Sequence, residues 1–369
     1  MKKIFGKVIY YLFRYLPLKD IIIFETFNGK EISDSPKAIY DVMTSSTMYN
    51  LKWVINSDYK NINIDQRYLV QKYSIKWLYY LATSKVFIKN TGDNHHFIKR
   101  RGQLFFQTWH GIPIKKMGYD VDNSNSNFEA DFVKDWDYLL LPNSFTSECM
   151  RSSTGYKGNI IELGYPRNDI FYNYSTDLIN KIYKTLDLSK KYKYILYAPT
   201  FREEYLNDDS KLIALLNKMT IPKGYKLLIK LHPLLKNTKF DNTDLVNVCH
   251  YDNIYNLMII SDCLITDYSS VMFDYLNLRK PIILFTYDLK YYQNSERGFY
   301  FDITTFPGIF ANNIMELKKV ISNFDELYTF DKKFEECYEK FCKNEDGNSA
   351  KRCSDFIISK IENRRKNDK

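Results

Sequence analysis

The chain has 369 residues, which is enough for two domains of ordinary size, each with its own core. A hydrophobic content of 45% and an aromatic content of 17% exclude a disordered chain. The 53 Lys and Arg exceed the 44 Asp and Glu, and the resulting net charge of +9 suits an anionic partner such as a nucleotide, a nucleic acid or an acidic membrane surface. No helix-turn-helix, zinc-finger or RNA-binding motif accompanies this charge, so we expect no nucleic-acid partner. The six cysteines form no CxxC pair, which is typical of a reducing, cytoplasmic compartment.

The first 18 residues fit neither a signal peptide nor a membrane-spanning helix. Lys7 and Arg14 interrupt the apolar pattern, no apolar run approaches the roughly 18 residues that a spanning helix needs, and no small-residue cleavage site follows. Apolar residues spaced four apart, from Ile4 to Leu16, instead predict a basic amphipathic helix. Such a helix would lie on an anionic membrane surface. The alternative is a helix that packs against a domain.

Apolar runs of β type alternate with helical stretches along the rest of the chain. Several runs are continuous rather than alternating, as expected of strands buried on both faces of a parallel sheet. The runs span residues 21–24, 53–55, 86–88, 104–106, 138–141, 160–163, 194–197, 226–231, 263–265 and 281–285. After about residue 311 the pattern is helical to the end. This alternation predicts an α/β architecture with two similar domains and a cleft between them.

The best boundary between the two domains follows the Gly164-Tyr165-Pro166 turn. The next residues form a polar, helix-compatible connector without a strand pattern. The predicted division is a basic amphipathic segment at 1–18, an N-terminal domain at 19–168, the connector at 169–193, a C-terminal domain at 194–345, and a helix with a basic tail at 346–369.

Two histidines and a serine pair follow three of the predicted strands. His110 comes after the run 104–106, in a turn marked by Gly and Pro, and His232 comes after the run 226–231. Ser269 and Ser270 follow the run 263–265. Open α/β sheets bind ligands at the carboxyl ends of their strands. A lone histidine in such a loop is often only a hydrogen-bonded structural residue, but the three strand ends together indicate a site for a phosphorylated ligand.

Other polar residues near these strand ends extend the predicted site. The serine pair leads into a helical pattern, so its hydroxyls and free backbone N–H groups would face a phosphate, and the alternative is an ordinary helix cap. Asp274 could accept hydrogen bonds from a sugar hydroxyl, and Thr200 adds a hydroxyl after the run 194–197. Lys230 lies on the same side of its strand as His232. Arg167 supplies a cation suited to bidentate phosphate contact.

The chain lacks the motifs of several nucleotide-binding classes. It has no P-loop lysine motif and no GxGxxG, so neither a Walker-type NTPase nor a dinucleotide oxidoreductase is supported. Asp120 and Asp122 form a DxD pattern, which binds metal in some glycosyltransferases, but this pair follows no recognisable strand. We therefore expect no metal ion and no cofactor.

Motifs dispersed over nearly the whole chain carry a family resemblance. The most specific are Thr108-Trp109-His110-Gly111 and Thr266-Asp267-Tyr268-Ser269-Ser270. The others are Asp34-Ser35-Pro36-Lys37-Ala38, Gly164-Tyr165-Pro166-Arg167-Asn168-Asp169, Leu196-Tyr197-Ala198-Pro199-Thr200, Leu231-His232-Pro233 and Arg297-Gly298-Phe299-Tyr300. In these residues the chain resembles the CDP-glycerol:poly(glycerophosphate) glycerophosphotransferase family of teichoic-acid synthesis.

This resemblance implies a GT-B-like fold, in which two Rossmann-like domains face an interdomain cleft, and peripheral attachment to the cytoplasmic side of the cell membrane. It implies transfer of glycerol phosphate from CDP-glycerol to a hydroxyl of a lipid-linked acceptor, with release of CMP, in the synthesis of teichoic acid or a related capsule polymer. His110 would be the general base, and His232 would be a second catalytic residue. The donor-binding residues would be Trp109, Gly111, Ile112, Pro113, Arg167, Pro199, Thr200, Lys230, Leu231, Ser269, Ser270 and Asp274.

Three alternatives remain open at this point. The same motifs fit a ribitol-phosphate transferase that uses CDP-ribitol, and they do not separate a primase from a polymerase. A nucleotide-sugar epimerase on a GT-B scaffold would be expected to transfer protons with carboxylates, whereas these strand ends supply histidines and hydroxyls. A non-catalytic membrane scaffold would not need His110, His232 and the serine pair together.

Overall fold

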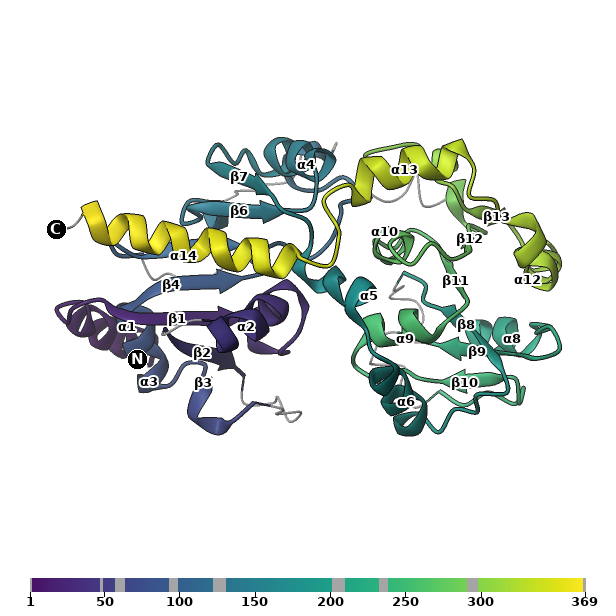
Figure 1. The fold of residues 1–369 in the computed structure, drawn as a ribbon, viewed down its shortest axis with the longest axis horizontal. Coiled ribbons are helices and arrows are strands. Elements are labelled where there is room, and N and C mark those ends of the chain that lie inside the picture. The colour runs from purple at the N-terminus through teal and green to yellow at the C-terminus, as the bar shows by residue number, and fades with distance from the viewer. Residues whose placement is uncertain are drawn as a thin grey trace. The chain divides into compact units, whose positions relative to one another are not determined.

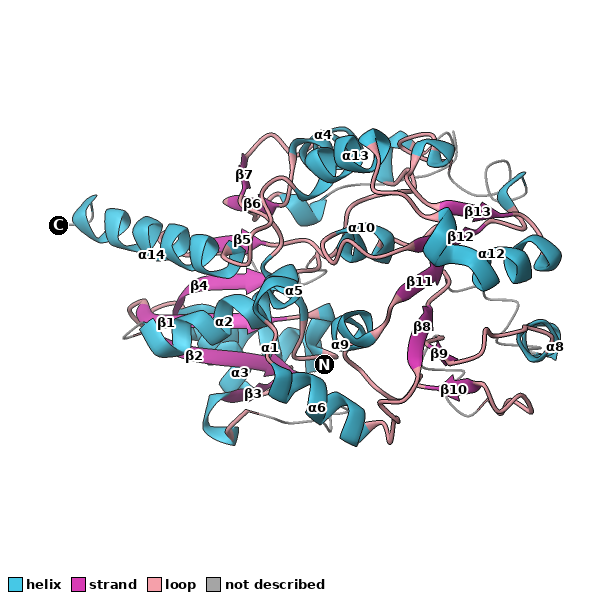
Figure 2. Cartoon of the chain, turned by 45° about the vertical axis from the view of Figure 1, so that its right-hand side comes forward, coloured by secondary structure: helices cyan, strands magenta, loops and turns pink. Residues whose placement is uncertain are grey.

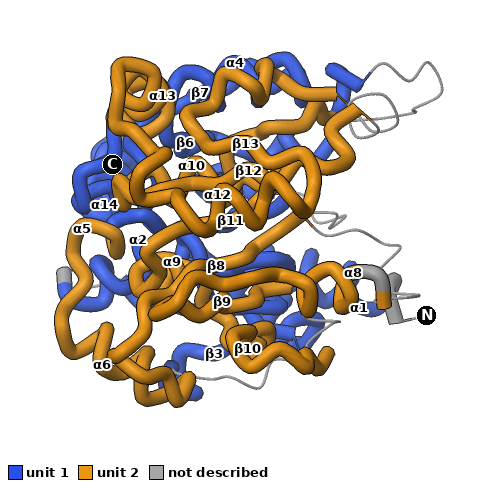
Figure 3. Tube along the Cα trace, turned by 90° about the vertical axis from the view of Figure 1, so that its right-hand side faces the viewer, with its two compact units in different colours: residues 1–110, 118–169, 344–369 blue, residues 111–117, 170–343 orange. Residues whose placement is uncertain are grey.

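The computed structural model describes residues 2–46, 49–56, 64–92, 99–121, 131–200, 210–231, 238–290 and 298–367. The chain forms two compact units (Figure 3). Unit 1 comprises residues 1–110, 118–169 and 344–369, and unit 2 comprises residues 111–117 and 170–343. Each unit contains one parallel β-sheet accompanied by helices (Figure 2). The predicted α/β class is therefore confirmed.

Seven parallel strands form the described sheet of unit 1, in the order β3-β2-β1-β4-β5-β6-β7. The strands are β1 (Lys19–Glu25), β2 (Asn50–Ile55), β3 (Leu69–Gln71), β4 (Ser84–Lys89), β5 (Leu104–Gln107), β6 (Tyr138–Leu141) and β7 (Asn159–Glu162). The α-helices are α1 (Lys2–Phe13), α2 (Asp34–Ser46), α3 (Ile75–Thr83), α4 (Ser144–Thr154) and α14 (Ser349–Asn367). Short 3-10 turns include η1 (Phe27–Gly29) and η5 (Pro166–Asp169).

Alternate residues of the central strands form the core of unit 1. Ile22 and Phe24 of β1 share one face of the sheet with Val86 and Ile88 of β4, because side chains alternate along a strand. Apolar residues of α2 and α14, among them Ile357, are buried against this face. Figure 1 shows α14, in yellow, running alongside the sheet although it lies at the end of the chain. The C-terminal helix therefore completes the core of the unit that the N-terminal half builds.

Six parallel strands form the described sheet of unit 2, in the order β10-β9-β8-β11-β12-β13. The strands are β8 (Lys193–Tyr197), β9 (Tyr225–Ile229), β10 (Leu245–Asn247), β11 (Cys263–Thr266), β12 (Ile282–Phe285) and β13 (Ile309–Ala311). The α-helices are α5 (Ile170–Asn173), α6 (Thr176–Thr185), α8 (Ser210–Asn217), α9 (Ile254–Ile260), α10 (Val271–Leu276), α12 (Ile314–Leu327) and α13 (Lys332–Cys342).

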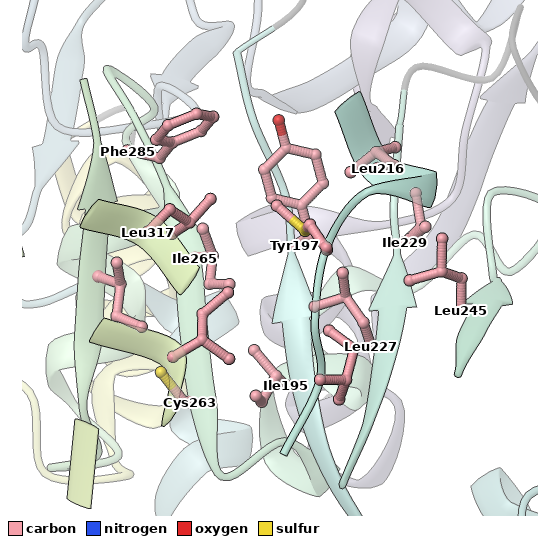
Figure 4. Packing of buried hydrophobic residues seen from close by; sticks show 14 of the residues in the cluster. Ile195, Tyr197, Leu216, Leu227, Ile229, Leu245, Cys263, Ile265, Phe285 and Leu317 are labelled. Carbon is pink, nitrogen blue, oxygen red and sulfur yellow. The ribbon is translucent and has the colours of Figure 1, made fainter. Parts of the chain in front are cut away.

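The core of unit 2 is built in the same way. Ile195, Ile229 and Ile265 come from three neighbouring strands and gather on one face of the sheet, where Leu317 of α12 packs against them (Figure 4). Cys263 is fully buried in this cluster. All six cysteines are buried, and none of them forms a disulfide.

The chain divides at points that differ from the predicted domain ranges. Residues 1–18 and 346–369 fold with unit 1, and 111–117 and 170–193 fold with unit 2. The segment 111–117 joins unit 2 through its backbone, because Lys115 pairs antiparallel with Phe299 and the N–H of Tyr300 donates to the oxygen of Ile114 at 2.8 Å. The hydrophobic pattern of the sequence does not show which core a short internal segment or a terminal helix packs against.

Candidate active site

His110 lies beyond the end of β5, beside the residue that follows β4. The two strands pair in parallel with Lys89 opposite Gln107, and the N–H of Thr108 donates to the oxygen of Lys89 at 2.8 Å. This register places Nδ1 of His110 2.7 Å from the backbone oxygen of Asn90. A carbonyl oxygen can only accept a hydrogen bond, so Nδ1 carries the proton and Nε2 of the neutral ring is left as the acceptor.

The backbone and rings around His110 restrict its orientation. Trp109 has a φ of 54°, a left-handed conformation that is rare for a bulky residue, and its N–H donates to Oε1 of Gln107 at 2.9 Å. The Trp109 and His110 ring centroids are 4.4 Å apart, and Phe27 of η1 approaches the imidazole edge to face at 6.0 Å. Unusual backbone of this kind persists only where the surroundings fix it, and it is common at functional sites.

The charge state of His110 follows from its surroundings. The side chain keeps solvent-exposed surface, yet the protein around it desolvates the charged imidazolium and so lowers the pKa of His110 below 6.5. The hydrogen bond to Asn90 and the carboxylate of Asp34 oppose this shift, whereas the guanidinium of Arg167 adds to it. The lowered pKa favours the neutral, proton-accepting form of His110 at neutral pH.

Arg167 and Asp34 form a buried ion pair within unit 1. Nη1 of Arg167 lies 3.3 Å from Oδ1 of Asp34, and the two side chains are only 3% and 4% exposed. The guanidinium also lies over the ring of Tyr165, 4.2 Å from its centroid. In this structure Arg167 therefore fixes Asp34 near His110, and its contact with a donor phosphate stays a prediction.

In unit 2, Asp267 joins the ends of β8 and β11. Its Oδ1 accepts the backbone N–H of Thr200 at 2.7 Å and that of Tyr268 at 2.6 Å. The hydroxyl of Thr266 also donates to the oxygen of Ala198 at 2.7 Å. Two of the predicted donor-binding segments, the one with Thr200 and the one with the serine pair, are thus held together at the carboxyl edge of one sheet.

Gly111 lies close to Ser270 within unit 2. A Cβ placed on Gly111 would lie 3.0 Å from Oγ of Ser270, so the absence of a side chain is what permits this approach. Ser270 stands at the N-cap position of α10, but its side chain makes no capping hydrogen bond. Both Ser269 and Ser270 are partly exposed. Ser270 therefore does not act as an ordinary side-chain cap of α10, which was the alternative interpretation of the serine pair.

The remaining predicted donor-binding residues differ in their exposure. Lys230 donates from Nζ to the backbone oxygens of Cys249 at 3.1 Å and of Tyr251 at 2.7 Å. Asp274 is 4% exposed on α10, which leaves its contact with a sugar hydroxyl a prediction. Lys230, Pro199 and Trp109 are partly exposed, whereas Asp274, Gly111, Ile112, Pro113 and Leu231 are buried.

His232, the second predicted catalytic residue, lies outside the described residues, as does Asp122 of the DxD pattern. The first aspartate of that pattern, Asp120, accepts the hydroxyl of Ser152 at 2.7 Å from its Oδ2. Within the part of the chain that the structure describes, no three His, Cys, Asp or Glu side chains gather in a group that could hold a metal ion.

Sequence reasoning missed Asn90 and the part that Asp34 plays beside it. Asn90 follows the apolar run 86–88 in the way that His110 follows 104–106. Examining every polar residue within two positions of a predicted strand end, rather than only histidines and hydroxyls, would have included Asn90, although not its contact with His110.

Comparison with known proteins identifies the family. The family model described as CDP-Glycerol:Poly(glycerophosphate) glycerophosphotransferase matches residues 8–359. The chain belongs to this family. It is 34% identical to the teichoic acid glycerol-phosphate transferase of Staphylococcus aureus (strain NCTC 8325 / PS 47), over 97% of this chain and 98% of that protein. It is 32% identical to the teichoic acid poly(glycerol phosphate) polymerase of Bacillus spizizenii, over 95% of each chain.

A solved structure supports the same assignment. The wall teichoic acid polymerase TagF, in a variant with a histidine replaced by asparagine and soaked with CDPG, matches with a TM-score of 0.85 and 29% sequence identity. The match covers 97% of this chain and 94% of that chain. The predicted family, its GT-B-like fold with two Rossmann-like domains, and the enzyme class of glycerophosphotransferase are confirmed.

Proposed function

We propose that this protein transfers glycerol phosphate from CDP-glycerol to a hydroxyl group of a lipid-linked acceptor and releases CMP, in teichoic-acid synthesis. One observation carries the proposal: the hydrogen bond from Nδ1 of His110 to the Asn90 carbonyl leaves Nε2 as a proton acceptor. The family assignment supports the reaction, and relatives named for glycerol phosphate at 34% and 32% identity support glycerol over ribitol in the donor.

In the proposed reaction, Nε2 of His110 takes the proton of the acceptor hydroxyl while the hydroxyl oxygen attacks the phosphorus that bears glycerol. The bond between this phosphorus and the oxygen of CMP breaks, and CMP leaves with the bonding electron pair. The lowered pKa of His110 keeps the imidazole unprotonated before the reaction, as a general base requires. Phosphoryl transfer of this kind depends mainly on positioning and charge stabilisation.

The donor diphosphate is assigned to the strand ends of unit 2. Hydroxyl groups of Thr200, Ser269 and Ser270 supply hydrogen-bond donors at the carboxyl edge of β8 and β11. Gly111 lets backbone pass close to Ser270, and it is the residue next to His110 in the chain. Arg167 remains a further predicted contact for the phosphates, and His232 remains the second predicted catalytic residue.

We also propose that α1 attaches the protein to the cytoplasmic side of an anionic membrane. Phe5, Val8 and Leu12 are 66%, 53% and 61% exposed, and Tyr15 just beyond the helix is 90% exposed. These apolar side chains face outward together with the exposed Lys7, which favours a surface-bound helix over one that packs wholly against the domain. No helix in the described part of the chain is long and apolar enough to span a membrane.

The proposed reaction is tested by following CMP release. The full chain is incubated with a lipid-linked acceptor and either CDP-glycerol or CDP-ribitol, and the mass of the lipid product is measured by mass spectrometry. We expect CMP from CDP-glycerol, and acceptor heavier by glycerol phosphate units, whose number separates a primase from a polymerase. If CMP is released from CDP-ribitol but not from CDP-glycerol, the donor is CDP-ribitol and the proposed donor is wrong. Failure with both donors, in protein that binds neither, would contradict it.

A further inference from the structure

We infer that Asn90 is a positioning residue that holds His110 in its proton-accepting tautomer, an inference that rests on the proposed role of His110 as the base. Asn90 follows β4 and is fully buried. Its backbone oxygen accepts the hydrogen bond from Nδ1 of His110 at 2.7 Å. The contact that selects the tautomer therefore comes from a main-chain carbonyl, whose direction depends on how the rest of Asn90 is fixed.

The side chain of Asn90 is fixed at both ends. Its Oδ1 accepts the backbone N–H of Phe27 at 2.9 Å, and its Nδ2 donates to Oδ2 of Asp34 at 2.9 Å. The amide cannot rotate without breaking both bonds, and a buried polar group that loses its partners is costly. The residue is therefore locked, and its carbonyl stays directed at the imidazole.

The partners of Asn90 are themselves held in place. Oδ1 of Asp34 accepts the N–H of Ser35 at 2.6 Å and a hydrogen bond from Arg167, so Oδ2 is the oxygen that meets Asn90. Phe27 has a left-handed backbone with a φ of 45°, and its ring contacts the imidazole of His110. Asn90 thus links His110 to η1 and to the first residue of α2.

The chemistry of these two partners requires an amide at position 90. The N–H of Phe27 needs an acceptor, whereas the carboxylate of Asp34 needs a donor, and an asparagine offers one of each at the right length. An aspartate would bring two buried carboxylates together, which raises the pKa of at least one of them. An alanine would leave both partners without this contact.

The consequence for His110 is a choice between two neutral forms. If Nδ1 loses its fixed acceptor, the proton is free to move to Nε2, and the ring then presents an N–H instead of a lone pair to the acceptor hydroxyl. A loss of this kind lowers the rate of the chemical step without removing a contact to the donor. Loss of the groups that orient a metal-ligating histidine typically costs about 10–100-fold in activity, and we expect an effect of the same order for an oriented base.

The test compares Asn90→Ala with a matched control, Asn168→Ala. Asn168 is also a buried asparagine of unit 1 whose Nδ2 donates to a carboxylate, that of Glu345 at 2.7 Å, but no hydrogen bond described for it involves His110. The full chain is labelled with ¹⁵N-histidine, the His110 signals are assigned with His110→Gln, and the two ring nitrogens are observed above the pKa of His110. kcat and KM for CDP-glycerol are measured on the same samples.

In the wild type we expect a protonated Nδ1 and an unprotonated Nε2. In Asn90→Ala we expect a mixture of the two tautomers, with kcat lower by about 10–100-fold and little change in KM, while Asn168→Ala keeps the wild-type spectrum and kcat. A wild-type His110 protonated on Nε2 would overturn the inference even if Asn90→Ala does not fold, and so would a folded Asn90→Ala with unchanged spectrum and kcat. Full activity in His110→Gln would instead overturn the proposed function, so the two failures are distinguishable.

Discussion

Replacing Gly111 by alanine should disturb one side chain, that of Ser270. Gly111 does not have a left-handed backbone, so alanine is permitted there conformationally. The new Cβ would lie 3.0 Å from Oγ and 3.5 Å from Cβ of Ser270, and apart from the two chain neighbours no other described residue has an atom within 4 Å. Ser270 would therefore have to move by a few tenths of an ångström.

The size of the effect follows from two opposing contributions. Overpacking typically costs about 1–3 kcal/mol, and the smaller freedom of the unfolded chain on changing Gly to Ala returns about 0.4–1 kcal/mol. We expect a net loss of about 1 kcal/mol, which corresponds to a fall of about 2–4 °C in the unfolding temperature of a domain of 150–250 residues. Ser270→Ala removes the Oγ, so the nearest atom to the new Cβ is then the Ser270 Cβ at 3.5 Å, an ordinary contact.

The assay is a double-mutant cycle read by thermal unfolding and by calorimetric titration of CDP-glycerol. Gly111→Ala with Ser270→Ala should recover the unfolding temperature of Ser270→Ala alone, whereas Gly111→Ala with Ser269→Ala should not. Affinity should behave differently: loss of a hydroxyl contact to a charged phosphate costs about 1.5–3 kcal/mol, or roughly 10- to 150-fold in Kd, and the double variant should not regain it. Additive unfolding shifts would refute the contact, and wild-type affinity in Ser270→Ala would refute its role in donor binding.

Three further predictions concern the base, the ion pair and the N-terminal helix. His110→Ala should lower kcat by about 10²–10⁴-fold. Because desolvation by the surrounding protein lowers the pKa of His110, kcat/KM of the wild type should fall only as the pH drops through a value below 6.5. A pH-rate profile with its acid limb above 6.5 would contradict this. Asp34→Asn removes one charge of the buried Arg167–Asp34 ion pair, so chemical denaturation should show a loss of about 3–5 kcal/mol. A loss below 1 kcal/mol would mean that the pair is dispensable. The wild type should sediment with anionic vesicles at low salt and be released at high salt. Val8→Ser with Leu12→Ser should reduce this sedimentation at low salt, because both side chains are exposed on α1. Unchanged binding would mean that another surface attaches the protein.

Most of the fold was accessible from the sequence because its central strands are buried on both faces. The ten predicted runs all correspond to strands of the two sheets, and the polar connector after Pro166 begins with helices α5 and α6. The strands that the pattern did not predict are β3, β10 and β13, each of three residues and each at the edge of its sheet. An edge strand of this length buries too few side chains to leave an apolar run.

The candidate site was accessible only where side-chain chemistry marks it. A histidine, a serine pair and a threonine at strand ends stand out in a sequence because their side chains can act on a phosphate, and His110 was found in this way. Asn90 acts on His110 through a backbone oxygen that every residue possesses, so its type carries no direct signal. Its type matters through contacts with Phe27 and Asp34, which lie 63 and 56 residues away in the chain. Those contacts arise only when β1, β4 and β5 lie side by side in one sheet. The sequence is therefore enough to propose His110 as the base, whereas the proposed role of Asn90 requires the fold.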